Sequence, residues 1–436
     1  MHQANGIHST KNLPVNKIIV STLVFLTFMV LPFFTHALTI SEAIKRALQV
    51  SFVIKEQKGA IESARFSYLA SIDPYLPSLS LETSYQRRLT VASVETLRTY
   101  TGDSRDIYNF SLRIDYRIFD GGQRESKRKM AYTLLEEERD SLRLLEEDVI
   151  YKTKNAFWGA LSKKSIIEKR KEAYEATKKV YRLTCERYNE GVAKKIDVIQ
   201  AEVNMIQAEI ELEEAKKEYE KALEVLKSLL QMEEIEKIEG PEDEPTLLLE
   251  KEELLRRASS ERPDILRQKK EIEKLTYSYQ EKKSAFYPKV DIELYEARQD
   301  KRFFPEGASR SLFLTLSFPI FDGIGRYYNL KKVSADIESA KNRLYELERS
   351  AKQEVTQALI DFNLSIEKVK MYRALLTQAE ANFSQALEEY RVGKGDILTL
   401  LQSERNLAKA KEGLVDSIYN AHISLAYLQK VASLKD

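Results

Sequence analysis

The stretch RYNEGVAKKIDVIQAE at residues 187–202 recurs in altered form as EYRVGKGDILTLLQSE at residues 389–404. A tyrosine, a glycine, a glutamine and a glutamate keep the same places in both copies. Each copy stands between two proline-free runs of helix-favouring residues, so each is predicted to be the tip of a helical hairpin. The shared glycine supplies the positive φ that the end of a helix commonly needs. The sequence therefore predicts the same long hairpin twice, which indicates a duplicated chain.

A second repeated motif supports the duplication. RIFDGGQR at 117–124 matches PIFDGIGR at 319–326, and each copy stands where a predicted strand ends and a long helix begins. Each half is therefore expected to run short helix, strand, strand, long helix, tip and short helix. The predicted boundaries are a first repeat at 38–236 with its tip at 188–197, a joining segment at 237–250, and a second repeat at 251–436 with its tip at 390–399.

The predicted helices carry apolar residues in a coiled-coil pattern. In the first long helix, expected from about Arg124 to Tyr188, the apolar residues at seven-residue spacing are Leu135, Leu142, Val149 and Ala156. A seven-residue repeat requires a partner along the helix, so we expect a long coiled-coil structure. The segments before each pair of strands are expected to be single helices at 38–72, with Ser41 as N-cap, and at 251–286.

Four segments change to a period of two, which indicates strands, at about 78–94, 107–119, 289–298 and 311–321. One face is apolar and includes Tyr108, Phe110, Leu112, Ile114, Tyr116, Leu312, Leu314 and Leu316. The other face includes Arg113, Asp115, Arg117, Asp291 and Glu293. A half-buried sheet in a soluble domain would show this alternation. A membrane barrel with an apolar outer face and a polar interior would show it as well.

The number of strands decides what a membrane barrel would require. If the apolar face meets lipid, four strands leave two open edges whose backbone groups hydrocarbon does not satisfy. Barrels made from a single chain begin at about eight strands. Several chains would then share one barrel, and three chains would supply twelve strands. In that arrangement the apolar set above faces lipid, and the charged set lines a hydrated lumen.

The N-terminus has the layout of a secretory signal. Lys11 and Lys17 precede an apolar run at 18–34, and small residues lead to a cleavage point after Ala37. We expect residues 1–37 to be a signal peptide, with an uncleaved anchor helix as the alternative. The sequence has its one cysteine far from this point, so it carries no signal for lipid attachment.

Composition argues against several classes of function. The 69 Lys and Arg residues nearly cancel the 68 Asp and Glu residues, so no basic excess favours nucleic acid. After cleavage the chain would keep one histidine, His422, and one cysteine, Cys185. A histidine-based triad, a His/Cys zinc site or a disulfide framework cannot be assembled from these two residues. We expect no enzyme activity, no cofactor and no metal.

The ordered set of motifs resembles the TolC-like outer-membrane efflux channel family. The set comprises the export signal, LTISEAIKRAL at 38–48, RPDI at 262–265, AFYPKVDIEL at 285–294, the two FDG turns and the two Y-x-x-G tips. The resemblance implies a homotrimer with a twelve-stranded β-barrel in the outer membrane and a long helical tunnel in the periplasm of a Gram-negative-type bacterium. It also implies docking at the tips to a periplasmic adaptor (membrane fusion) protein and an inner-membrane pump of the RND or ABC type. Such a channel is a passive exit duct of a tripartite efflux or type I secretion system.

The resemblance also assigns residues at the tips. Those expected at the tip and in partner docking are Tyr188, Gly191, Asp197, Tyr390, Gly393 and Gly395. The acidic residues that ring the closed aperture in the family fall on Thr399 and Gln402 here, so the acidic ring is absent as such. Asp396 is a candidate substitute in the aperture lining, and its alternative role is a helix N-cap.

A periplasmic coiled-coil adaptor or scaffold without its own pore is the main alternative, because heptads alone fit either. The four amphipathic strands favour the channel. The residues indicate no particular cargo, so drugs, metal ions and polypeptides all stay open.

Overall fold

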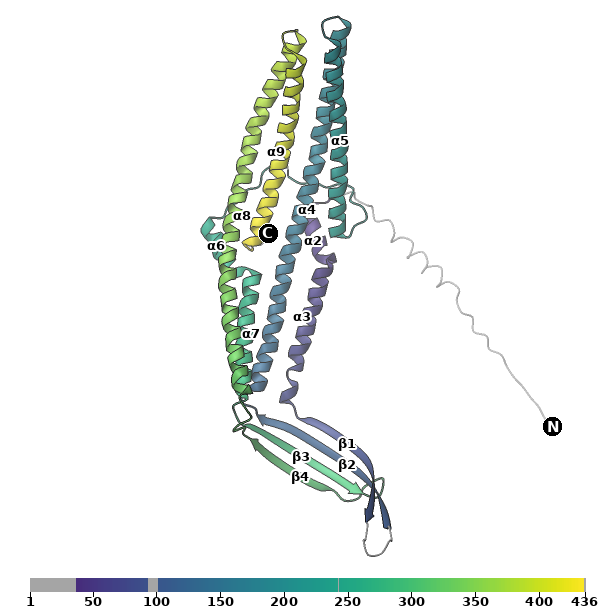
Figure 1. The fold of residues 1–436 in the computed structure, drawn as a ribbon, viewed down its shortest axis with the longest axis vertical. Coiled ribbons are helices and arrows are strands. Elements are labelled where there is room, and N and C mark those ends of the chain that lie inside the picture. The colour runs from purple at the N-terminus through teal and green to yellow at the C-terminus, as the bar shows by residue number, and fades with distance from the viewer. Residues whose placement is uncertain (1–36, 93–100, 242, 435–436) are drawn as a thin grey trace, which may run out of the picture.

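The computed structural model describes residues 37–92, 101–241 and 243–434, in which the helices form one long bundle with a four-stranded sheet at one end (Figure 1). In chain order the elements are α2 (Ile40–Val50), α3 (Phe52–Ala70), the 3-10 turn η2 (Asp73–Tyr75), β1 (Ser78–Ala92), β2 (Thr101–Phe119), α4 (Gln123–Asn189), α5 (Lys195–Leu230), α6 (Lys251–Glu261), α7 (Pro263–Ser284), β3 (Lys289–Asp300), β4 (Ser309–Ser317), α8 (Gly325–Arg391) and α9 (Ile397–Val431). This confirms the predicted mainly α fold with a small β part and a duplicated order of elements. The expected signal peptide lies outside the described residues apart from Ala37.

Helix α4 is central to the bundle. It packs against α5 and α9 in the half that carries the tips, and against α3 and α7 in the half next to the sheet (Figure 1). Along α4, the pair α2 and α3 therefore lies end to end with α5. Along α8, the pair α6 and α7 lies end to end with α9 in the same way. In the tip half the helices follow the order α5, α4, α9, α8, which leaves α5 and α8 at the two edges.

Two helices that were expected to be continuous are each interrupted by one residue. Ser51, at φ −52° and ψ 122°, separates α2 from α3, and the Val50 carbonyl beside it accepts a hydrogen bond of 3.1 Å from Gln231. Arg262, at φ −60° and ψ 126°, separates α6 from α7. Pro263 explains the second break, because proline disfavours a helical conformation at the residue before it. The prediction of single helices at 38–72 and 251–286 is wrong at these points.

The N-cap of α2 is Thr39 and not Ser41. The Thr39 hydroxyl accepts a hydrogen bond of 3.4 Å from the Glu42 N–H, and the Thr39 N–H donates one of 3.0 Å to the Glu42 carboxylate. These two bonds form a capping box, which the Thr-x-x-Glu spacing could have indicated.

The sheet is antiparallel throughout, in the order β1-β2-β3-β4. β2 begins at Thr101, earlier than expected, and a register shift between Arg117 and Phe119 interrupts its pairing with β3 near the helices. β4 ends at Ser317, short of the predicted 321, because Pro319 has no N–H to donate to a ladder. The predicted end of the first strand at 93–94 lies outside the described residues. Within the described chain, β1 and β4 are the open edges.

The largest cluster of buried side chains surrounds Phe157 and Trp158 in the middle of α4. Trp158 stacks on His422 of α9, with ring centroids 4.4 Å apart, and His422 Nε2 lies 2.9 Å from the Asp243 carbonyl oxygen. A Cβ placed on Gly240 would lie 2.8 Å from Trp158, so only glycine allows this approach. The cluster therefore fixes the joining segment against the bundle.

In the parts of the chain that the structure describes, we find no helix with the length and apolar character required to cross a membrane.

Candidate functional site

The first tip joins α4 to α5. Gly191 has φ +79°, which ends α4 with the left-handed residue expected there. The Asp197 carboxylate accepts a hydrogen bond of 2.9 Å from the Lys194 N–H and so caps the start of α5. Tyr188 lies at the end of α4 with 41% of its surface exposed. The first tip therefore presents an open surface.

The second tip joins α8 to α9 and is built differently. Gly393 has φ +76°. At Gly395 a Cβ would lie 3.1 Å from the backbone nitrogen of Tyr390, so the loop folds closely onto the end of α8. Tyr390, the counterpart of the exposed Tyr188, is only 4% exposed. The tyrosine of the motif is therefore exposed in the first copy and buried in the second.

Tyr390 is buried because it packs against the first hairpin. Its hydroxyl donates to the Thr184 hydroxyl at 3.2 Å, inside a cluster that contains Val180, Ala386 and Leu400. Arg187 lies over the Tyr390 ring, with its guanidinium carbon 4.9 Å from the ring centroid. One Arg187 nitrogen donates a hydrogen bond of 2.7 Å to the Arg391 carbonyl oxygen. The two hairpins are therefore joined at their ends by contacts of Arg187 and Tyr390.

A second contact between the hairpins lies further from the tips. The Asn204 side chain donates a hydrogen bond of 3.1 Å to the Glu404 carboxylate, and both residues are buried. Burial raises the pKa of Glu404, and the hydrogen bond from Asn204 opposes this shift. No role was predicted from the sequence for Thr184, Arg187, Asn204 or Glu404. The burial of Glu404 could have been predicted, because this carboxylate lies on the same face of α9 as the apolar Leu400.

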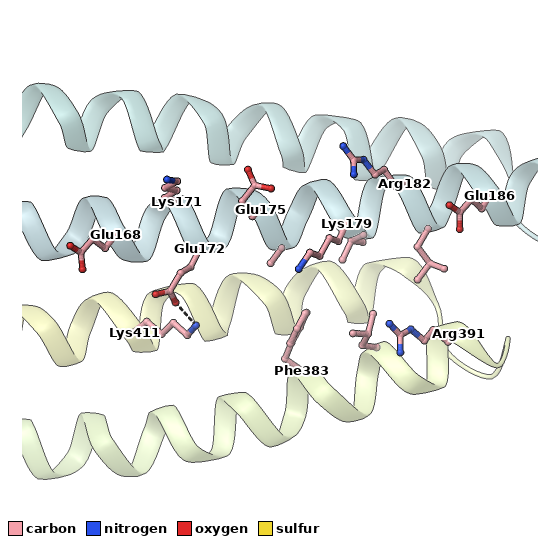
Figure 2. A pocket seen from close by; sticks show the side chains of 14 residues that line it. Glu168, Lys171, Glu172, Glu175, Lys179, Arg182, Glu186, Phe383, Arg391 and Lys411 are labelled. Atoms are coloured by element: carbon pink, nitrogen blue, oxygen red, sulfur yellow. Dashed lines mark hydrogen bonds and ion pairs between the residues drawn. The ribbon is translucent and has the colours of Figure 1, made fainter.

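A groove of about 1010 Å³ runs along the hairpins near the tips (Figure 2). Helix α4 contributes charged side chains of both signs, and Phe383 and Arg391 of α8 lie on the opposite wall (Figure 2). Glu172 of α4 accepts a hydrogen bond of 2.8 Å from Lys411 of α9 across it. The groove thus has a mixed apolar and charged lining drawn from α4, α8 and, through Lys411, α9.

The three candidate aperture residues lie together at the start of α9. Asp396 is the N-cap of this helix, and its carboxylate accepts hydrogen bonds from the Thr399 N–H at 3.0 Å and the Thr399 hydroxyl at 2.7 Å. These hydrogen bonds lower the pKa of Asp396. Gln402, one turn on, donates to Asn406 at 3.0 Å. Asp396 thus has the capping role that was its alternative, and an aperture role stays a prediction.

The strand residues fall on the two faces that their alternation predicts. The register places Ile114 opposite Leu79 of β1 and Leu294 of β3, and Leu294 opposite Leu312 of β4. Most of this face is exposed, with Leu312 at 67%. The face is therefore a continuous apolar surface across four strands with no cover from the rest of the described chain. Contact with lipid stays a prediction.

The opposite face of the sheet is crossed by ion pairs. Arg113 lies 3.2 Å from Glu293, and Arg117 lies 2.7 Å from Asp291. Near the helices this face lines a hollow of about 600 Å³, to which Asp115 also contributes. The mixed signs indicate a hydrated surface without a strong preference for either sign of charge.

The outer membrane efflux protein family model matches residues 43–230 and 254–433. Outer membrane protein TolC of Escherichia coli (strain K12) is 26% identical over 107 residues, a match that covers 24% of this chain and 22% of that protein. The matching region thus spans about a fifth of TolC.

Solved structures match over most of the chain. A membrane protein from Pseudomonas aeruginosa has a TM-score of 0.79 at 20% identity, with coverage of 90% of this chain and 93% of that chain. The Campylobacter jejuni CmeC outer membrane channel has a TM-score of 0.78 at 18% identity, with coverage of 91% and 87%. VceC of Vibrio cholerae, an outer membrane protein, also has a TM-score of 0.78 at 18% identity, with coverage of 90% and 95%. At these identities the likeness shows the fold, whereas the family model spans most of the sequence. The chain belongs to the outer membrane efflux protein family.

Proposed function

We propose that the protein is the exit duct of a tripartite efflux or type I secretion system. Three copies would form a twelve-stranded barrel in the outer membrane and a helical tunnel in the periplasm. An adaptor and an inner-membrane pump would open the tunnel at its tips, and the duct itself would carry out no chemistry. Family membership supports the efflux role, and the unpartnered edges of the single chain support the assembly.

The edges of the helical layer carry apolar side chains that the described chain leaves uncovered. On α5 the exposed residues follow the three-and-four spacing of a coiled-coil seam: Ile196, Ile199, Val203, Ile206 and Ile210. On α8 the exposed set is Ile360, Leu364, Met371 and Leu375. Stripes of this kind are expected to pack against another helix. Since α5 and α8 lie at opposite edges, neighbouring copies would join α5 of one to α8 of the next and close a ring.

The sheet needs the same closure. β1 and β4 each leave one row of backbone groups unpaired within the described chain, and the apolar face lies next to both. In hydrocarbon such groups must be paired, so β1 of one copy would pair with β4 of the next. This is the observation that carries the proposal: both layers of one chain are open at the same two sides.

The tips supply a means of opening. Arg187 and Tyr390 join the first hairpin to the second through a hydroxyl pair, one carbonyl contact and one cation–π contact. The net free energy of a single hydrogen bond of this kind is about 0.5–1.5 kcal/mol. A partner that binds the tips could therefore separate the hairpins without unfolding either one.

Planar-bilayer conductance of the purified protein tests the duct, with native mass spectrometry to count the copies. We expect a trimer with a low basal conductance. The double variant Arg187→Ala/Tyr390→Phe should conduct more, because it removes the contacts between the hairpins. Tyr188→Phe is the matched control at the exposed tyrosine and should leave conductance unchanged. A monomer with no conductance in any variant would refute the proposal and favour a scaffold.

A further inference from the structure

The apolar face of the sheet does not end at the same register on every strand. On β2 it continues beyond Ile114 through Leu112 and Phe110 to Tyr108. On β3 it ends at Leu294, which is paired with Ile114. The next two residues on that face of β3 are charged, with Glu296 opposite Leu112 and Arg298 opposite Phe110. The end of the apolar band on β3 therefore lies six register positions closer to the helices than its end on β2.

Charged residues mark this boundary on β4 as well. Arg310 pairs with Glu296 in the ladder, two positions beyond Leu312. The Glu296 carboxylate lies 2.9 Å from an Arg298 nitrogen and 3.0 Å from Arg310 Nε. One carboxylate thus lies between two guanidinium groups, and this cluster keeps one net positive charge on the apolar side of the sheet.

The cluster is accessible in the single chain. The Arg310 side chain is 74% exposed, and among the described residues it contacts Glu296 through Nε alone. In the single chain its two terminal nitrogens are therefore available as donors, and its side chain lies on the apolar face, which stays outermost in the proposed barrel. A guanidinium with free terminal nitrogens is suited to hold a phosphate through two parallel hydrogen bonds.

Aromatic residues mark the end of the apolar band on β1 and β2, where Tyr108 pairs with Asp300, four positions beyond Glu296 on β3. Tyr85 and Tyr108 contact each other with ring centroids 5.1 Å apart, and Phe303 stands edge-on to Tyr108 at 5.6 Å. Aromatic side chains gather where hydrocarbon meets the headgroups. Arginine is costly at the midplane of a bilayer and is tolerated near its surface, so arginine residues at this end of the sheet are expected near the headgroups.

We propose that Arg298 and Arg310, held together by Glu296, bind the phosphate of an anionic lipid headgroup at the end of the apolar band far from the helices. The inference rests on the proposed function, because it requires the apolar face to meet lipid. The acyl chains of such a lipid would lie on Leu112 and Leu312, next to its phosphate. Lipid bound there would fix the depth of the barrel in the membrane.

The test measures lipid retention by the purified full-length protein. The protein is held in detergent micelles that contain phosphatidic acid, separated by gel filtration, and the retained lipid is counted by mass spectrometry. Phosphatidylcholine with the same acyl chains is the zwitterionic comparison. We expect Arg298→Gln/Arg310→Gln to retain about tenfold less phosphatidic acid and an unchanged amount of phosphatidylcholine. The matched control, Arg113→Gln/Arg117→Gln on the polar face, should retain as much as wild type.

Glu296→Gln distinguishes a cluster that binds lipid from one that only forms ion pairs within the sheet. This change removes the competing carboxylate, so a phosphate site should retain more phosphatidic acid. If the cluster only stabilises the sheet, Glu296→Gln would lower thermal stability without raising retention, and the proposal would be wrong. Millimolar inorganic phosphate should not displace the lipid. Displacement would mean that the arginines bind any phosphate ion and do not select a lipid, and this result would also overturn the proposal.

A separate measurement reports on the proposed function. Leu112→Trp in a Trp158→Phe background places a single tryptophan on the apolar face, where lipids brominated in their acyl chains should quench it. Quenching together with arginine-independent retention would overturn the lipid site and leave the duct standing. No quenching would mean that the face does not meet lipid, and both proposals would fall.

Discussion

The Asn204 amide donates a hydrogen bond of 3.1 Å to the Glu404 carboxylate, and this bond joins the first hairpin to the second in the interior of the bundle. A cavity of about 100 Å³ beside it is also lined by Arg170, Glu211 and Arg405. Burial raises the pKa of Glu404, because the ionised carboxylate loses hydration in the interior of the bundle. The free energy needed to separate the two hairpins should therefore depend on the Asn204–Glu404 hydrogen bond and on the charge of Glu404.

Asn204→Ala should destabilise the protein by about 1–3 kcal/mol, because it leaves a buried carboxylate without its donor. Glu404→Gln keeps an acceptor for Asn204 and removes the charge, so we expect equal or higher stability at neutral pH. Thermal unfolding of the two single variants and the double variant measures the coupling. If Asn204→Ala costs the same stability in wild type as it does when combined with Glu404→Gln, the two side chains act independently.

Glu147 of α4 predicts a dependence of stability on pH. Burial raises its pKa from 4.5 to about 7, and the nearby Asp264 adds to the shift. Because the folded-state pKa is raised, the stabilising contribution is complete below pH 4.5 and is lost as pH rises through about 7. Glu147→Gln should therefore gain stability relative to wild type between pH 5 and pH 8, by about 2–3 kcal/mol.

Unfolding temperatures of wild type and Glu147→Gln in the same series of buffers provide this measurement, since other titrating groups cancel in the difference. Parallel curves across the whole series would contradict the assignment to Glu147.

Ile114→Arg tests the apolar face of the sheet. The substitution places a charge among residues that we propose to meet hydrocarbon, at a cost of about 2–4 kcal/mol per copy at mid-bilayer depth. Outer-membrane fractionation and native gels should show impaired insertion and fewer oligomers. Ser111→Arg is the matched control, because it lies on the same strand with its side chain on the polar face. Similar insertion of the two variants would show that the faces do not differ in their surroundings.

Gly393→Val tests the second tip. Gly393 has φ +76°, a conformation that costs a β-branched residue about 1–3 kcal/mol. We expect the barrel to insert normally, while binding of an adaptor and efflux activity decrease. Gly59→Val is the control, since Gly59 lies within α3 and a Cβ there meets nothing within 4 Å. Loss of insertion in Gly393→Val alone would mean that this turn is needed for assembly and not only for docking.

The order and type of the elements could be predicted from the sequence, because they depend on local patterns. The seven-residue series in α4, the alternation in β2 and the two tip glycines each lie within a short stretch, so their structural consequences are local. The faces of β2 followed for the same reason: Ile114 and Arg113 are neighbours in the chain and must point to opposite sides of a strand. The breaks at Ser51 and Arg262 were missed, although Pro263 marks the second one.

The contacts between the hairpins were decided by the tertiary structure alone. Tyr188 and Tyr390 occupy the same place in the repeated motif, yet only Tyr390 is buried, because it meets Thr184 from the other half of the chain. Asn204 and Glu404 are likewise far apart in sequence, and no local pattern encodes their pairing. The sequence by itself determined two similar hairpins and an amphipathic sheet, since each follows from local spacing. The packing of α4 against α9 decided which side chains join the hairpins, because that choice depends on long-range geometry that a repeat does not specify.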